Sequence, residues 1–206
     1  MKVWKRSLPV WLLTLVMLLT ACGTPSQPDQ PDGTETWREA YEETGAYLQA
    51  QAAPSVGSNG GEWAVIGLSR AGLLSDAAAQ SYEQTVEDYV KQAGSVRLHH
   101  AKSTENSRTI LGLTAAGYNA ANVAGVDLTA GLTDMAYLRA QGTNGPIWAL
   151  IALDCHGYDI PQCADGEEQT TREGLVAEIL SYQCSDGGWA LMGDESDVDM
   201  TAMALT

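Results

Sequence analysis

One short segment of nearly uncharged residues returns four times along the chain and decides the fold. The four copies, in chain order, are Trp63-Ala-Val-Ile-Gly-Leu-Ser-Arg-Ala-Gly72, Arg108-Thr-Ile-Leu-Gly-Leu-Thr-Ala-Ala-Gly117, Trp148-Ala-Leu-Ile-Ala-Leu153 with Gly157, and Met200-Thr-Ala-Met-Ala-Leu205. Their first residues lie roughly 40 to 50 positions apart, which is the spacing of one copied supersecondary unit. Such units bury their apolar faces against one another, so we expect the copies to be neighbours in space.

Amphipathic stretches of helical period separate these copies and carry most of the charge. They are expected at about 36–51, from 75 to about 90, 128–140 and 170–182. A helix that is apolar on all sides has to be buried, so the copies themselves are expected to form inner helices at about 61–71, 105–117, 144–155 and 197–206. The pattern predicts an all-α domain of about four helical hairpins, with outer and inner helices alternating. Spacing alone allows either a partial α/α toroid or an open right-handed solenoid.

The first 34 residues are expected to lie outside this domain. Residues 1–21 combine a basic start with a short apolar stretch, as a secretory signal does, and Leu19-Thr20-Ala21-Cys22 resembles the lipobox of bacterial lipoproteins. In such proteins the cysteine becomes lipidated, so Cys22 is the expected attachment site. Residues 22–34 hold three prolines among small polar residues and are expected to form an extended tether. We therefore expect an exported protein, lipid-anchored on the outer face of the membrane, with its folded domain at 35–206; the alternative is an ordinary signal peptide with Cys22 unmodified.

The composition narrows the classes of partner. The chain carries 11 Lys and Arg against 26 Asp and Glu, and removal of the three basic residues of the signal changes the formal net charge from −15 to −18. This charge opposes binding to nucleic acid and to anionic lipid headgroups. No cofactor is expected. With Cys22 assigned to lipid, Cys155, Cys163 and Cys184 remain, so at most one intrachain disulfide can form, and the sequence does not choose among the three pairings.

Residues 55–206 resemble the terpenoid cyclase and protein prenyltransferase superfamily of α/α toroids. Three segments carry the resemblance: Gly60-Gly61-Glu62-Trp63, Gln183-Cys184-Ser185-Asp186-Gly187-Gly188-Trp189-Ala190, and Asp197-Val198-Asp199-Met200. The second is similar to the QW-type motif, whose role in that family is structural. Family rings close with about six hairpins, so the resemblance implies a C-terminally truncated ring.

The resemblance implies two functions of different class. Exported members include ligand carriers that use the mouth of the ring, which here corresponds to Asn59–Glu62, Asn144–Trp148 and Asp194–Asp199. On this hypothesis the chain is a binding module for an unknown small molecule or surface partner, and Trp63 and Trp148 either line the mouth or pack in the core, with the core favoured. The alternative is a class II terpene cyclase, in which Asp199 matches the proton donor and Asp197 its supporting carboxylate. A purely structural surface protein is a third possibility.

Two observations weigh against the cyclase alternative. Met200 replaces the last Asp of the family motif, and the chain has no Phe with which to stabilise carbocations. Asp197 is also well placed to cap an inner helix, with Asp199 near its positive end. Asp154-Cys155-His156 has zinc-ligand types, but consecutive helical residues point in different directions, so no metal site is expected.

Overall fold

The computed structural model describes residues 33–51, 55–57 and 61–206. The expected signal peptide, Cys22 and residues 22–32 of the tether lie outside the described residues. Secondary structure in the described part is helical apart from two isolated bridges. The elements are α2 (Gly33–Ala50), α3 (Glu62–Arg70), α4 (Asp76–Ala93), α5 (Thr104–Ala115), the 3-10 helix η1 (Leu128–Leu132), α6 (Met135–Arg139), α7 (Asn144–Asp154), α8 (Arg172–Ser181) and α9 (Val198–Ala204). The prediction of an all-α protein is confirmed.

The chain divides into two units, residues 1–43 and 44–206, and each is described by itself. In the first unit the described residues form the N-terminal part of α2, where Trp37 and Tyr41 are exposed and Arg38 lies over the Trp37 ring at 5.5 Å. This helix begins at Gly33, so the last two residues expected in the tether are helical.

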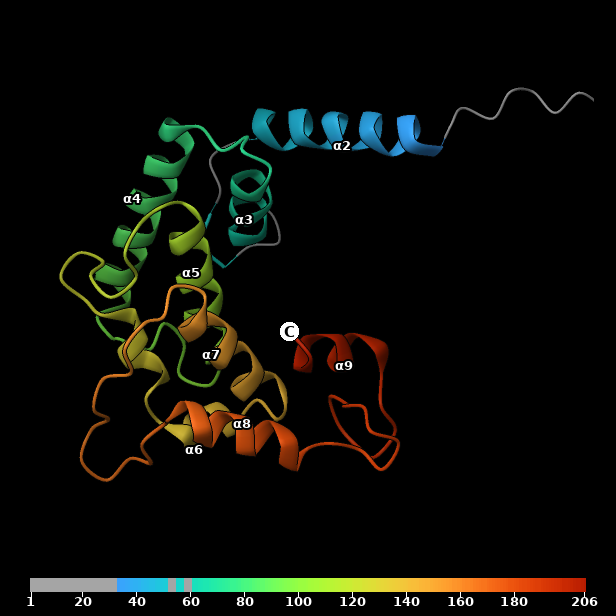
Figure 1. Ribbon diagram of the computed structural model, residues 1–206. Helices are drawn as coiled ribbons and strands as arrows, with labels where there is room; N and C mark the ends of the chain where they lie inside the picture. Colours follow the sequence, from blue (N-terminus) through green and yellow to red (C-terminus); the bar gives the residue numbers. More distant parts are fainter. Residues whose placement is uncertain (1–32, 52–54, 58–60) are drawn as a thin grey trace, which may run out of the picture. The chain divides into compact units, whose positions relative to one another are not determined.

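The four copies of the repeated segment form α3, α5, α7 and α9, which pack in that order, each against the next (Figure 1). The other elements lie against this row: α4 and η1 contact α5, and α6 and α8 contact α7. Hydrogen bonds join neighbours within the row. The Ser69 hydroxyl donates to the carbonyl of Ala115, at 2.5 Å, and the hydroxyls of Thr114 and Tyr158 lie 2.8 Å apart.

The first three inner helices end in the same way. Each is followed by a glycine in the left-handed region, which L side chains rarely adopt, and the next N–H returns to a leucine carbonyl near the helix end. The three glycines and their φ angles are Gly72 at 69°, Gly117 at 88° and Gly157 at 63°. The returning bonds run from Leu73 to Leu68, from Tyr118 to Leu113 and from Tyr158 to Leu153, at 2.8, 2.9 and 2.8 Å. The repeat in the sequence is therefore a repeat in backbone structure.

Burial follows position in the row. Six of the twelve residues of α5 and six of the eleven of α7 are buried, against three of nine in α3 and one of seven in α9. The difference arises because α5 and α7 have an inner helix on each side. The main core lies around them, and its largest fully buried side chains include Tyr82, Ile110, Leu113, Leu128, Leu132, Leu138 and Leu153.

The prediction of one outer helix over 128–140 is wrong. The segment forms η1 and then the short α6, because the backbone between them pairs with another segment: Met135 N–H donates to the carbonyl of Glu168 at 2.8 Å, and Thr170 N–H donates to that of Thr133 at 2.7 Å. Asp134 begins α6 by accepting the Ala136 N–H at 3.1 Å. These bonds cannot coexist with a continuous helix.

Gly67 and Gly112 occupy the same place in two copies but have different surroundings, which gives a matched test of the row. A methyl group at Gly112 would meet the Tyr82 ring, with Cζ only 3.0 Å away, whereas nothing lies within 4 Å at Gly67. We expect Gly112→Ala to lower the free energy of unfolding by about 1–3 kcal/mol. Gly67→Ala should raise it by about 0.5–1 kcal/mol, because alanine is the better helix former. Urea unfolding measures both, and equal effects would contradict the packing of α4 on α5.

Candidate functional site

Two tryptophans from alternate copies of the repeat meet at the start of the inner helices. Trp63 is the second residue of α3 and Trp148 the fifth of α7, and their rings lie 5.4 Å apart at 62°, edge to face. Trp63 is 46% exposed and Trp148 is half-buried. The favoured alternative, that Trp63 packs in the core, is wrong: nearly half of this side chain is exposed.

A cluster of charged side chains from α3 and α5 includes Glu62, the residue that precedes Trp63 in α3. Glu62 is fully buried, and its Oε2 accepts a hydrogen bond from Arg108 Nε at 3.0 Å. Its Oε1 accepts the Gly57 N–H at 2.9 Å, and Arg108 Nη2 also donates to Glu105 Oε2 at 2.5 Å. Arg108 holds the same repeat position in α5 as Trp63 in α3 and Trp148 in α7. Two carboxylates share one guanidinium, so the cluster carries net negative charge.

Tyr82 of α4 completes this cluster from the buried side. Its side chain is fully buried, and its hydroxyl has no hydrogen-bond partner among the described residues. Burial raises the pKa of the Tyr82 phenol, and the nearby carboxylate of Glu62 raises it further. The phenol therefore stays neutral, and it lies too deep to serve as a nucleophile or base for a ligand at the surface.

Side-chain bonds between neighbouring copies fix the helix starts around the tryptophan pair. Gln141, just before α7, accepts the Thr104 N–H at 2.9 Å and the Ser103 hydroxyl at 3.0 Å at the start of α5. The Thr143 hydroxyl, at the start of α7, donates to the carbonyl of Ala190 at 3.0 Å. These bonds satisfy groups that a helix end leaves free and hold one copy to the next.

The Gln183–Ala190 segment is the first half of the connection between α8 and α9. Cys184 N–H donates to the carbonyl of Gly188 at 2.8 Å, and Gly187 turns the chain with φ at 90°. Gln183 Nε2 closes the turn on the Gly187 carbonyl at 2.8 Å. Trp189 is buried, and its Nε1 donates to the carbonyl of Ile179 in α8 at 2.7 Å. Each of these residues is held by structural contacts rather than turned toward a ligand.

The two aspartates named for the cyclase alternative lie at the start of α9. Asp197 caps this helix, because its Oδ1 accepts the Met200 N–H at 2.7 Å, which confirms its expected capping position. Asp199 lies in the first turn. Both side chains are exposed, so the described residues do not form around them the dry pocket that protonation of an alkene requires.

The remaining candidate groups lie apart from the tryptophan pair. Cys155, Cys163 and Cys184 are free thiols in the described structure, and burial raises the pKa of the Cys155 thiol. Within residues 33–51, 55–57 and 61–206, no three His, Cys, Asp or Glu side chains come together as metal ligands would. In the same ranges no helix combines the length and apolar character of a membrane span.

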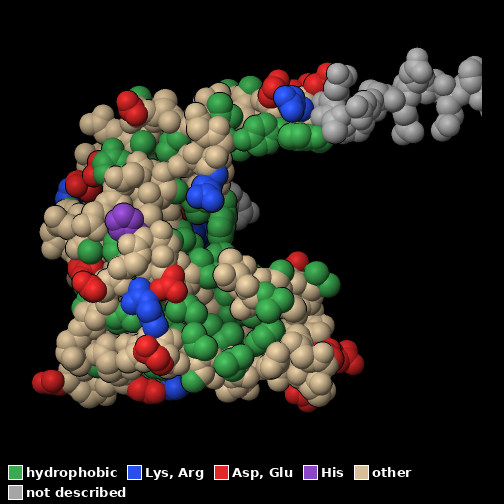
Figure 2. Space-filling model, viewed as in Figure 1, with side chains coloured by type: hydrophobic (Ala, Val, Ile, Leu, Met, Phe, Trp, Pro, Cys, Tyr) green, Lys and Arg blue, Asp and Glu red, His purple; other side chains and the backbone are tan. Residues whose placement is uncertain are grey.

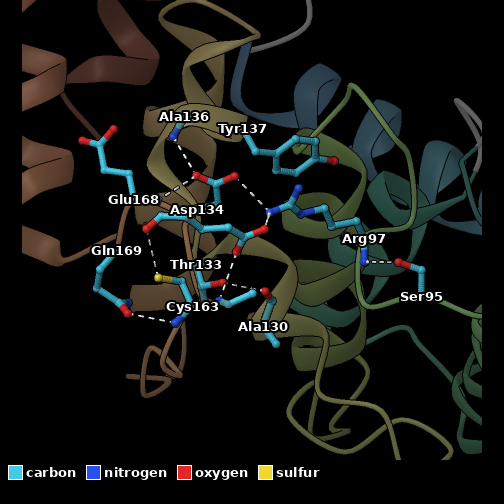
Figure 3. Close-up of polar contacts among 12 residues, drawn as sticks. Ser95, Arg97, Ala130, Thr133, Asp134, Ala136, Tyr137, Cys163, Glu168 and Gln169 are labelled. Atoms are coloured by element: carbon cyan, nitrogen blue, oxygen red, sulfur yellow. Dashed lines mark hydrogen bonds and ion pairs between the residues drawn. The ribbon is translucent and has the colours of Figure 1, made fainter.

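A second charged cluster, which was not predicted from the sequence, surrounds Arg97 (Figure 3). One nitrogen of Arg97, Nη2, donates to Asp134 Oδ2 at 3.0 Å and to Glu167 Oε1 at 2.6 Å, and the guanidinium lies 4.5 Å from the centre of the Tyr137 ring. These ion pairs join three loop segments, and the positive charge of Arg97 is matched by the two carboxylates. No local signal could have found it, because its partners are 37 and 70 positions away from Arg97.

Comparison of the chain with protein-family models, curated proteins and solved structures finds no match. The candidate site therefore stands on its own geometry: an exposed indole supported by a second tryptophan, beside a buried, net-negative charge cluster.

The ion pair between Glu62 and Arg108 should be essential to the stability of this site. Arg108→Met leaves the buried Glu62 carboxylate without its cation, and we expect a loss of about 3 kcal/mol in unfolding free energy. The double variant Glu62→Gln with Arg108→Met should recover most of that loss, since the fully buried side chain at position 62 is then neutral. Urea unfolding of these two variants and of Glu62→Gln alone completes the cycle; additive losses would show that the two side chains do not interact.

Proposed function

We propose that the chain is an exported, lipid-anchored protein whose helical domain is part of an α/α toroid and acts as a ligand-binding module. The order of α3, α5, α7 and α9, with other helices against them, supports the toroid over unrelated helical packing. The anchor rests on the signal-like residues 1–21 and the lipobox-like residues before Cys22. The binding role rests on the meeting of Trp63 and Trp148.

The chemistry of the site indicates the kind of ligand. The exposed Trp63 indole is a flat apolar ring system, and its edge-to-face contact with Trp148 holds it in a fixed orientation. An indole face attracts cations through its quadrupole, and the neighbouring Glu62 and Glu105 outnumber Arg108. We therefore propose an organic cation with a planar or apolar surface as the ligand class.

Binding is a better fit to this geometry than proton-transfer catalysis. A class II cyclase would use Asp199 as general acid, which calls for an aspartate held away from water among aromatic faces. Asp199 is exposed at the start of a short helix, and Asp197 is engaged as its cap. If the chain is a binding module, Asp199→Asn leaves ligand affinity unchanged.

Paired planar dyes of opposite charge test the proposal. The full chain should bind the cation acridine orange and not the anion fluorescein, as measured by fluorescence anisotropy. Trp63→Ala and Trp148→Ala should each weaken acridine orange binding about tenfold, since a cation on an indole face contributes on the order of 1–2 kcal/mol.

The control for this experiment is Trp37→Ala, which removes a tryptophan that is also exposed but lies in α2. It should leave dye affinity unchanged. Cys22→Ser should release the chain from the membrane fraction of bacterial cells without altering affinity. Equal weakening by Trp37→Ala and Trp63→Ala would show that the dye binds any exposed indole, and no weakening by Trp63→Ala would show that it responds only to the overall negative charge; in either case the proposed site would be wrong.

A further inference from the structure

A cavity of about 310 Å³ lies between the end of α2, the turn that joins α3 to α4, and the first turns of α4. We call it the α2–α4 cavity, and all of its lining residues belong to the second unit, residues 44–206. Its apolar lining residues are Leu48, Leu68, Leu73, Leu74, Ala77 and Ala78. Protein interiors leave few spaces larger than a water molecule, and this one has the size of a ligand pocket.

Specific contacts hold the walls of the α2–α4 cavity. Gln49 Nε2 at the end of α2 donates to the carbonyl of Leu73 at 2.8 Å. One turn earlier, the buried Gly45 brings the backbone of α2 close to the same turn, since a methyl group at this glycine would lie 2.6 Å from Leu73 Cδ1. On the other side Ser75 caps α4 by accepting the Ala78 N–H at 3.2 Å. The cavity is therefore bounded by elements that are fixed to one another.

The lining changes from polar at the surface to apolar in the interior. Gln49 and Gln51 are exposed, whereas Leu68 is only 5% exposed. The side-chain nitrogens of the two glutamines donate to the carbonyls of Leu73 and Tyr47, at 2.8 and 3.2 Å, which leaves their side-chain oxygens available as acceptors. The half-buried Ser81 also lines the cavity, and its hydroxyl bonds to none of the described residues. The cavity thus offers a hydrogen-bond donor and acceptors beside an apolar floor.

The charge of the protein restricts what can enter this cavity. None of the described residues that line it is charged. Acidic side chains are spread over the face of the molecule shown in Figure 2, where Lys and Arg are few, and the formal net charge of the chain is −15. An anion would be repelled by this charge, and any ion would lose its hydration among the leucines. The cavity therefore favours a neutral molecule.

We propose that the α2–α4 cavity binds a small neutral alcohol with an apolar body. A cavity of about 150 Å³ lined by apolar side chains accommodates benzene, so one about twice as large accommodates two fused rings. The rings would lie against Leu68 and its neighbouring leucines, while the hydroxyl would donate to a glutamine oxygen and accept from Ser81. This ligand differs in charge from the cation proposed for Trp63 and Trp148, and neither tryptophan lines the cavity.

Two naphthalene probes that differ in charge test the ligand class. 2-Naphthol is neutral at neutral pH, and naphthalene-2-sulfonate carries a negative charge on the same two rings. Isothermal titration calorimetry with the full chain should show binding of 2-naphthol and none of naphthalene-2-sulfonate. Equal binding of the two probes would overturn the proposal. So would binding of 2-naphthol that Trp63→Ala abolishes, because the ligand would then lie at the tryptophan pair.

Two matched variants of α4 test the location. Ala78→Leu places a larger side chain in the cavity and should weaken 2-naphthol binding at least tenfold. Ala93→Leu makes the same change at an exposed alanine at the other end of the helix, away from the cavity, and should alter the affinity less than twofold. Leucine is a good helix former, so both variants should fold, which urea unfolding checks. Equal effects of the two substitutions would overturn the proposal.

A third variant removes only the hydrogen-bond donor. Ser81→Ala keeps the apolar lining and should weaken 2-naphthol binding about fivefold, as expected for the loss of one hydrogen bond. It decides the question even if Ala78→Leu unfolds the protein, since unchanged affinity would contradict the proposed position of the ligand hydroxyl. Neither Ser81→Ala nor Ala78→Leu should alter the affinity for acridine orange, so failure of this proposal is distinguishable from failure of the tryptophan site.

Discussion

The structure depends on one constraint: a helix with few charged side chains and a mostly apolar surface has to be covered by other helices. Four such helices occur among the described residues, and the simplest way to cover them is to place them side by side in one row, backed by helices that carry most of the charge. The two central members, α5 and α7, have an inner neighbour on each side and hold the most buried residues. The same order explains the candidate site, since α3 and α7 flank α5 and their equivalent residues Trp63 and Trp148 touch across it.

The few cations of this acidic chain are used mostly inside the fold. Arg97, Arg108 and Arg139 each bind two carboxylates from different segments or turns, and Arg172 binds Asp154. The arginines therefore link elements that the hydrophobic core alone does not join. Because they are engaged in this way, the carboxylates that remain at the surface lack partners. This asymmetry favours a cationic ligand at the tryptophan pair proposed here as the binding site.

The inner helices could be predicted from the sequence because their signal is local. Mostly uncharged residues of helical period, followed by glycine in the first three copies, predict bounds within three residues of those observed for α3, α5, α7 and α9. The third outer helix could not be predicted, because its break at Thr133 and Asp134 comes from pairing with a segment more than thirty residues later. The exposure of Trp63 does not follow from the sequence, since a tryptophan in an apolar helix has the same local signature whether or not a neighbour covers it.

Native-state hydrogen exchange tests most directly whether the repeated helices form one cooperative row. The account predicts that amides of α5 and α7 exchange together and only through global unfolding, because each helix depends on the other for cover. Amides of α3 should exchange with a lower free energy of opening, and those of α9 with the lowest. Protection in α9 equal to that in α5, or opening of α5 while α7 stays protected, would contradict the row as the basis of the fold.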